Sequence, residues 1–208
     1  KDYCPNGLQV EGNPTIKHII TGVTASQALL EAAVEHNADT ILVHHGWFWK
    51  NEDERIRGMK KQRLAFTLHH NLNLFAYHLP LDAHPVVGNN SQLAKVLGFV
   101  QDVDEAGLPV GIGPGNLIQT GYLEKPLPLA EVAAHIGAVL DREPLVLGEP
   151  EKIIKRLAWC SGGAQGFMND AIDAGVDLYL SGEASEPTYH YAMETPTAYI
   201  GAGHHATA

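Results

Sequence analysis

Two adjacent histidines, His44 and His45, follow a short apolar run at residues 40–43 and precede Gly46. Such a run is typical of a buried strand whose end delivers side chains into a cleft. Because neighbouring residues on a strand point to opposite faces, the two rings can reach one centre only if the backbone turns, which Gly46 allows. Imidazole binds zinc, iron, nickel and copper, so the pair supplies half of a tetrahedral metal site. The alternative is one packed histidine and one solvated histidine.

Other candidate ligands also follow predicted strands. Asp82 comes after a predicted strand at residues 74–79, His204 after one at 197–200, and Glu183 after one at 177–180. Open α/β sheets bind ligands outside the carboxyl ends of their strands. We therefore expect three imidazoles and a carboxylate to converge there, as a dinuclear metal site requires. Glu183 is a candidate general base near a metal-bound water, or else a solvated or helix-capping residue.

Three further features have two interpretations each. His78 either donates a hydrogen bond that orients Asp82 or packs as an ordinary strand histidine. Cys160 is a candidate nucleophile, although a small buried core residue is the preferred interpretation. The aromatic residues 47–49 are expected to wall a pocket or a subunit contact.

The elements that position these residues form repeated βαβ units. A strand at 18–23, a helix at 27–36 capped by Thr24 or Ser26, and a strand at 40–45 form the first unit, with parallel strands. A strand at 152–160, a helix at 166–174 and a strand at 177–180 repeat this order, and the turn ending at Asp177 matches the one ending at Asp39. We predict an α/β fold of two similar lobes with mainly parallel strands: an N-terminal lobe (1–100), a linker with a smaller α/β insertion (101–150) and a C-terminal lobe (151–208).

Composition excludes several classes of protein. The 208 residues carry a formal net charge of −10 with only 14 Lys plus Arg, which argues against direct nucleic-acid binding. Two cysteines are too few for a disulfide framework, and the reducing cytoplasm is the expected location. No run of about 18 apolar residues is present, so we expect no membrane span.

Blocks of sequence along nearly the whole chain resemble one known family. The chain is similar to the GTP cyclohydrolase 1 type 2 homologues, the Nif-three-like dinuclear metal-binding proteins. The blocks that carry this resemblance are PNGLQVEG (5–12), TGVTAS (21–26), VHHG (43–46) with FWK (48–50), HLPLDAH (78–84), LSGE (180–183) and GHHAT (203–207).

The resemblance implies a Nif-three-like fold of two lobes, a ring-shaped hexamer and two divalent metal ions per chain. Its ligands would be His44, His45, Asp82 and His204, with a glutamate four residues after the last. Position 208 is alanine here, so the fifth ligand is absent as the sequence stands. Mixed imidazole and carboxylate ligation is compatible with zinc, iron, manganese or nickel.

The function expected from these residues is metal-dependent hydrolysis of a nucleotide or related small molecule. No phosphate-binding loop is present, so a nucleotide would be held by the metals and by basic groups such as Lys50, Arg55 and Arg57. The alternative is a non-catalytic, metal-binding hexameric scaffold or regulatory protein that presents its ring to protein partners.

Overall fold

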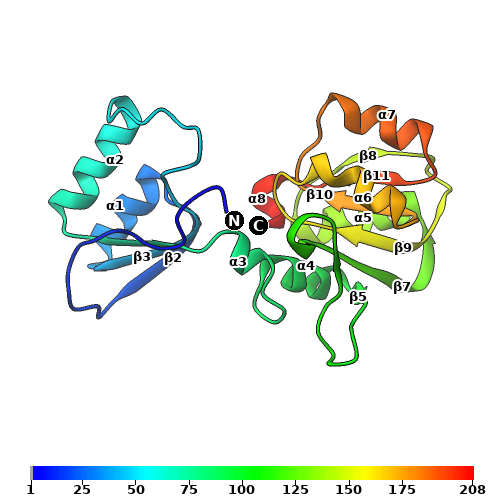
Figure 1. Cartoon of the computed structure of the whole chain (residues 1–208), viewed down its shortest axis with the longest axis horizontal. Coiled ribbons are helices and arrows are strands. Elements are labelled where there is room, and N and C mark those ends of the chain that lie inside the picture. The colour runs from blue at the N-terminus through cyan, green and yellow to red at the C-terminus, as the bar shows by residue number, and fades with distance from the viewer. Residues whose placement is uncertain (1) are drawn as a thin grey trace. The chain divides into compact units, whose positions relative to one another are not determined.

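The computed structural model describes residues 2–208, and the chain forms two compact units (Figure 1). The first unit ends at Leu81, and the second comprises Asp82–Ala208. Each unit has its own sheet, and each is described below by itself.

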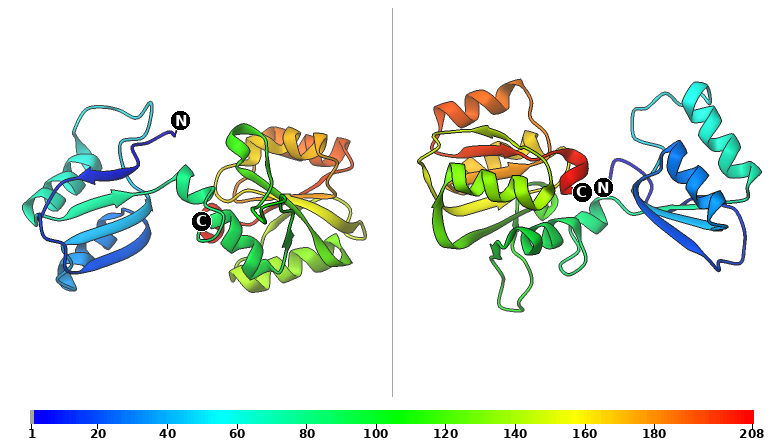
Figure 2. Two further views of the ribbon diagram at one scale, coloured as in Figure 1. Left: turned by 60° about the horizontal axis from the view of Figure 1, so that its bottom comes forward. Right: turned by 180° about the vertical axis from the view of Figure 1, so that it is seen from behind.

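The first unit is a four-stranded sheet covered by two helices. Its strand order is β1-β4-β3-β2, in which β2, β3 and β4 are parallel and β1 is antiparallel to β4. The helices α1 and α2 lie on the same face of this sheet (Figure 2). The elements are β1 (Gly7–Val10), β2 (Ile19–Thr24), α1 (Gln27–Glu35), β3 (Thr40–His45), α2 (Gly58–His69), β4 (Asn73–Ala76) and α3 (Leu79–Asp82), which reaches the second unit.

Local sequence explains why this first βαβ unit forms. The Ser26 hydroxyl accepts the Leu29 N–H and caps α1, which was one of the two predicted caps. Leu30 and Ala33 on α1 are fully buried and belong to the same hydrophobic cluster as Ile41 of β3. Burial of this apolar stripe is the main force that holds a helix of this length on the sheet.

The second unit is built on a seven-stranded sheet. Its strand order is β5-β7-β9-β10-β11-β8, with β6 paired to β7. Strands β9, β10 and β11 are parallel, whereas β7 and β8 run antiparallel to their neighbours. The strands are β5 (Val100–Gln101), β6 (Gly111–Ile112), β7 (Ile118–Pro128), β8 (Leu145–Leu147), β9 (Ile153–Trp159), β10 (Leu178–Ser181) and β11 (Ala198–Gly201). The helices are α4 (Asn89–Leu97), α5 (Leu129–Leu140), α6 (Met168–Asp173), α7 (Glu186–Glu194) and α8 (His204–Thr207), with short 3₁₀ turns at Pro114–Asn116 and Gln165–Phe167.

Alternate residues of the central strands face two different hydrophobic clusters. Leu157 and Trp159 of β9 belong to the cluster that includes α4 and α5. Ala158, between them, belongs to the cluster that includes α6. Residues 157–159 are buried on both faces and therefore form a continuous apolar run, whereas Lys155 earlier in the same strand is exposed.

The two units share one topology. The order β1-β4-β3-β2 of the first sheet corresponds to the order β8-β11-β10-β9 in the second. In each unit three consecutive strands are parallel, and the preceding strand pairs antiparallel with the last of them. The predicted α/β fold of two similar lobes is therefore observed.

The structure divides the chain at different positions from those predicted. Residues 101–150, expected as a linker and insertion, supply β6, β7, α5 and β8 to the second sheet and its core. Strand β7 pairs with β9 from Gln119↔Trp159 to Pro128↔Ile153, so it completes that sheet. Helix α4, expected in the first lobe, buries Leu93 and Leu97 in the same cluster as Trp159. These long-range contacts, which local patterns do not encode, set the division.

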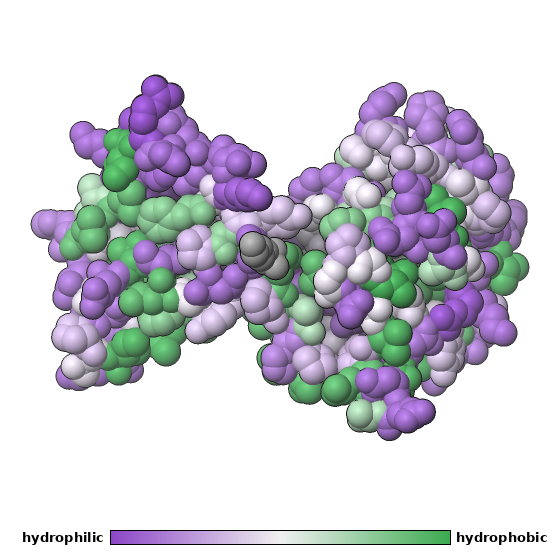
Figure 3. All heavy atoms as spheres, viewed as in Figure 1, coloured by the Kyte–Doolittle hydropathy of each residue, from purple (hydrophilic) through white to green (hydrophobic). Residues whose placement is uncertain are grey.

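Hydrophobic and hydrophilic residues are interspersed over the visible face of each unit (Figure 3). Among residues 2–208, no helix has the length and apolar character needed to cross a membrane.

Candidate metal centre

The two histidines at the end of β3 lie side by side, with ring centroids 4.5 Å apart. His44 is buried, and its Nδ1 lies 2.9 Å from the carbonyl oxygen of Tyr77. A carbonyl oxygen can only accept, so this hydrogen bond assigns the proton to Nδ1 and the lone pair to Nε2. His45 is half-buried, and its Nδ1 lies 3.4 Å from the Thr24 hydroxyl on β2. In this tautomer Nε2 of His44 carries the lone pair that a metal would need.

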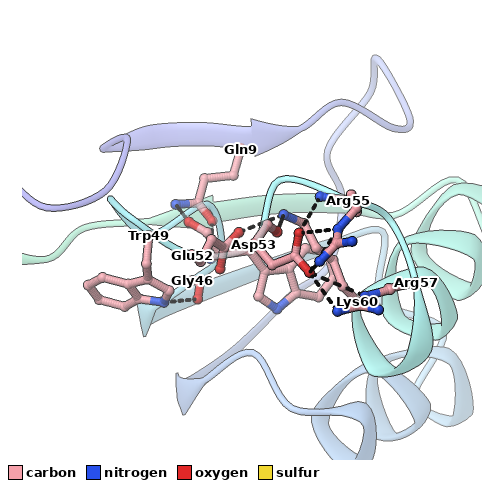
Figure 4. Close-up of polar contacts among 9 residues, drawn as sticks. Gln9, Gly46, Trp49, Glu52, Asp53, Arg55, Arg57 and Lys60 are labelled. Atoms are coloured by element: carbon pink, nitrogen blue, oxygen red, sulfur yellow. Dashed lines mark hydrogen bonds and ion pairs between the residues drawn. The ribbon is translucent and has the colours of Figure 1, made fainter.

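The backbone turn after His45 depends on Gly46. A Cβ added at position 46 would collide with the side chains of Gln9 and Ala76. Gln9 takes that space: its Oε1 accepts the Trp47 N–H at 2.7 Å, and its Nε2 donates to the Trp47 carbonyl at 3.0 Å. Gln9 and Gly46 lie next to each other in Figure 4. Position 46 therefore requires glycine because the side chains of Gln9 and Ala76 leave no room for a Cβ.

His78 adds a third imidazole to the pair. Its ring centroid lies 5.2 Å from that of His44 and 5.7 Å from that of His45. One ring nitrogen from each of the three histidines falls within 4.8 Å of the others. Trp49 supports the ring of His78 edge-on, with centroids 4.9 Å apart. Three converging imidazoles are a donor set that fits zinc, iron or nickel.

The carboxylate of Asp2 orients His78. Its Oδ1 accepts from His78 Nδ1 at 2.7 Å, which leaves the lone pair of that ring on Nε2. Burial opposes ionisation of Asp2, but hydrogen bonds from Asn6, His78 and the backbone N–H groups of Tyr3 and Leu79 hold its pKa below the ordinary value. The charged form of Asp2 is therefore favoured beside the imidazole.

Asp82 lies at the end of α3, and not directly after a strand as predicted. Strand β4 ends at Ala76, and Pro80 enters the first turn of α3, where its missing N–H costs nothing. Asp82 is buried, and its Oδ1 accepts from the Ser161 hydroxyl at 3.0 Å. The Ser161 N–H in turn donates to Asn90 Oδ1 at 2.8 Å. This chain of hydrogen bonds fixes the Asp82 carboxylate within the second unit.

His204 begins α8 and is held by Glu183. The distance from His204 Nδ1 to Glu183 Oε1 is 2.6 Å, so this carboxylate assigns the tautomer as Asp2 does for His78. The Tyr199 hydroxyl donates to the Glu183 carbonyl oxygen and anchors that residue. A Cβ at Gly162 would lie 3.1 Å from His204 Nε2, and one at Gly182 would lie 2.6 Å from His204 Cα. The two glycines make the space in which His204 sits.

Cys160 and Ala208, the remaining positions considered in the sequence, offer no group for chemistry at neutral pH. Cys160 is buried in the core of the second unit, which agrees with its interpretation as a small core residue. Burial, with a smaller effect from Asp82, raises the pKa of its thiol to about 12, so it is not a nucleophile at neutral pH. Ala208 follows α8 and carries no donor atom in its side chain.

Two residues that hold candidate ligands, one in each unit, are not singled out by the sequence. Asp2 carried no signal, because its partner His78 lies 76 residues away along the chain. Ser161 did carry one, since it lies two residues after the end of β9, at the kind of strand end where the other candidates were found.

Comparisons with known proteins agree with this architecture. The family model of Duf34/NIF3 (NGG1p interacting factor 3) matches residues 1–207. A "GTP cyclohydrolase 1 type 2 homolog" of Neisseria meningitidis is 56% identical over 207 residues, covering 100% of this chain and 80% of that protein. The homolog of the same name from Pseudomonas aeruginosa is 54% identical over 210 residues, with the same coverage.

A solved structure of similar sequence confirms the fold. The structure described as "protein ybgI, unknown function" matches with a TM-score of 0.92 and 50% identity, over 100% of this chain and 81% of that one. On the family match and these identities, the chain belongs to the Duf34/NIF3 family.

Proposed function

We propose that this chain binds divalent metal ions and uses them to hydrolyse a nucleotide or a related small molecule. The observation that supports this best is the convergence of His44, His45 and His78 within 4.8 Å, with two of the rings held by oxygen acceptors on Nδ1. In this proposal Asp82 and His204 also serve as ligands, as the resemblance implied, and two ions of zinc, iron, manganese or nickel are bound per chain.

A bound metal of this type lowers the pKa of a coordinated water toward neutrality and polarises the group that is attacked. Neighbouring side chains would orient the proposed ligands. Asp2 and Glu183 hold the rings of His78 and His204, and Ser161 holds Asp82. Glu183 is half-exposed and already bonded to His204, which favours positioning over a role as general base.

The sequence suggested that Arg55 and Arg57 help to hold a nucleotide, and their contacts in the structure give this role little support. Both guanidinium groups are bonded to Asp53, with nitrogen–oxygen distances of 2.9 and 3.0 Å (Figure 4). The single Asp53 carboxylate offsets one of the two positive charges, and its hydrogen bonds hold both side chains in place. We propose instead that substrate binding depends on groups nearer to the histidines.

The first test is metal content per chain by elemental analysis, with His78→Ala beside the unchanged protein. His69→Ala is the matched control, since His69 is exposed at the end of α2. We expect metal in the unchanged protein and the control, and a loss in His78→Ala. An Ala208→Glu variant is expected to gain metal, because it restores the carboxylate that the resemblance places there. Absence of metal from all four proteins would contradict the proposal.

The second test is a turnover screen of the metal-loaded protein with nucleotides and phosphoesters. Metal binding without turnover would support the alternative, a non-catalytic scaffold. In that case metal removal should change the assembly measured by light scattering, where a ring-shaped hexamer is the proposed state. We also propose that the protein works in the cytoplasm, because both cysteines are buried, free thiols.

A further inference from the structure

A cavity of about 240 Å³ lies in the first unit beside His45. Its walls come from the end of β3, the loop that follows Gly46, and α2. Three aromatic residues, Trp47, Phe48 and Trp49, contribute to the lining. Drug-sized ligands occupy pockets of about 300–1,000 Å³, so the volume of this cavity suits a group of one or two rings.

The aromatic walls are held in place by the backbone. The Trp47 indole N–H donates to the Ala25 carbonyl at 2.9 Å, and the Trp49 indole N–H donates to the Gly46 carbonyl at 3.2 Å. Because both polar edges are already bonded, the indoles offer the cavity chiefly apolar surface. Phe48 adopts φ +64°, a left-handed conformation that is rare for a bulky side chain. Such strain persists where the surroundings fix it and is concentrated at ligand-binding positions.

The two cationic side chains that line the cavity, Lys60 and Arg63, differ in their hydrogen-bond and ion-pair partners. Lys60 Nζ lies 2.8 Å from Glu52 Oε1 and donates to the Asp53 carbonyl at 3.0 Å (Figure 4). Arg63, one turn further along α2, has a buried Nε with no hydrogen-bond partner among residues 2–208. A buried donor of this kind is normally bonded. The charge of Glu52 is matched by Lys60, so the cavity keeps one positive charge, on Arg63.

We propose that this cavity binds a planar aromatic or heteroaromatic ring that carries one anionic group. The ring packs against Trp47, Phe48 and Trp49, and the anion accepts from Arg63. This orientation places the ring beside His45, one of the proposed metal ligands. The inference names a substrate class and to that extent rests on the proposed function, whereas binding of the ring itself requires no metal.

The test is calorimetric titration of the metal-stripped chain of 208 residues with 2-naphthoate, a planar two-ring anion. 2-Naphthamide is the neutral probe of equal shape, and decahydro-2-naphthoate is the non-planar anion. We expect 2-naphthoate to bind at least about tenfold more tightly than either. Equal binding of the three probes would overturn the proposal, since the cavity would then select neither planarity nor charge.

Variants assign the binding to Arg63. Arg63→Gln should weaken 2-naphthoate by about tenfold or more and leave 2-naphthamide unchanged. Lys61→Gln is the matched control, because Lys61 is an exposed cation on the same helix outside the cavity. If circular dichroism shows that Arg63→Gln is unfolded, Arg63→Lys replaces it, with weaker binding expected because the planar fork is lost. Unchanged affinity in a folded Arg63 variant would overturn the proposal.

The two proposals fail separately. Tight, Arg63-dependent binding with no turnover by the metal-loaded protein would support the ring-binding site and contradict the proposed hydrolase activity. Metal binding and turnover without binding of any planar anion would support the hydrolase activity and contradict the ring-binding site.

Discussion

Asp39 and Asp177 hold equivalent positions in the two units. In each, Oδ2 accepts hydrogen bonds from two consecutive backbone N–H groups, just before β2 in the first unit and within β9 in the second. Asp39 accepts from Lys17 and His18 at 2.7 and 3.1 Å. Asp177 accepts from Lys155 and Arg156 at 2.9 and 2.8 Å. Both residues also receive, on the main-chain oxygen, the N–H that starts the third parallel strand, at 2.9 Å. The same side chain therefore fixes the strand register in both units.

Substituting Asp177→Ala should destabilise the second unit by about 1–2 kcal/mol, because two backbone donors lose a charged acceptor. Asp177→Asn, which keeps an acceptor oxygen, should cost less. Thermal unfolding followed by circular dichroism measures both, with the exposed Asp173→Ala as control. If Asp177→Ala and the control unfold at one temperature, the carboxylate does not hold the register.

Removing the Asp2 carboxylate should weaken metal binding through His78. Asp2→Ala takes away the acceptor of His78 Nδ1, and loss of such a partner typically lowers metal affinity by about 10–100-fold. Competition against a chromophoric chelator measures the affinity. Glu11→Gln, an exposed change in the same unit, should leave it intact. Equal affinity in Asp2→Ala and the unchanged protein would show that Asp2 does not position a ligand.

Glu183→Gln separates positioning from general-base catalysis. If Glu183 only orients His204, the variant should bind metal less tightly, by about 10–100-fold, yet recover turnover at saturating metal. A general base would instead be lost at every metal concentration, together with one limb of the pH profile. We expect recovery, and a rate that stays at background under saturating metal would refute the positioning role.

The ion pair between Asp102 and Arg156 should make the second unit sensitive to acid. Its two short contacts, 2.9 and 2.6 Å, are bidentate, and hydrogen bonding from Arg156 lowers the pKa of Asp102 despite burial. A lowered folded pKa gives stability that is present above the unfolded pKa of about 3.9 and is lost as pH falls through the folded pKa. Because Arg156 is 43% exposed, solvent screening limits the contribution to about 1 kcal/mol.

Asp102→Asn should therefore lower the unfolding temperature at pH 7 and flatten its fall below about pH 4. Unfolding temperatures from pH 7 to pH 2 measure both effects. The pair is not responsible for the acid sensitivity if the variant and the unchanged protein lose stability in parallel over this range.

Cys160 should be dispensable for chemistry. Burial raises its pKa to about 12, so iodoacetamide should modify the folded protein far more slowly than the unfolded chain at pH 8. Cys160→Ala should keep its metal content and any turnover. A folded Cys160→Ala protein that binds metal but has lost turnover would restore the thiol as a nucleophile.

The sequence alone determined the local elements and the ends of the strands where chemistry is placed. Helical spacing and the Ser26 cap located α1, and the apolar run into His44 and His45 located β3 within its observed bounds. The internal repeat correctly matched the turn at Asp39 with that at Asp177. These signals are local, because periodicity and capping depend on residues a few positions apart.

The tertiary structure alone decided the pairings across long separations. It joined Asp2 to His78, ended β4 before Asp82 and gave Asp82 the Ser161 hydroxyl as its partner. It also assigned the segment after residue 100 to the second sheet and left the Arg63 Nε without a partner among residues 2–208. Each outcome depends on which distant surfaces pack together, and burial of apolar area, which has no direction along the chain, makes that choice.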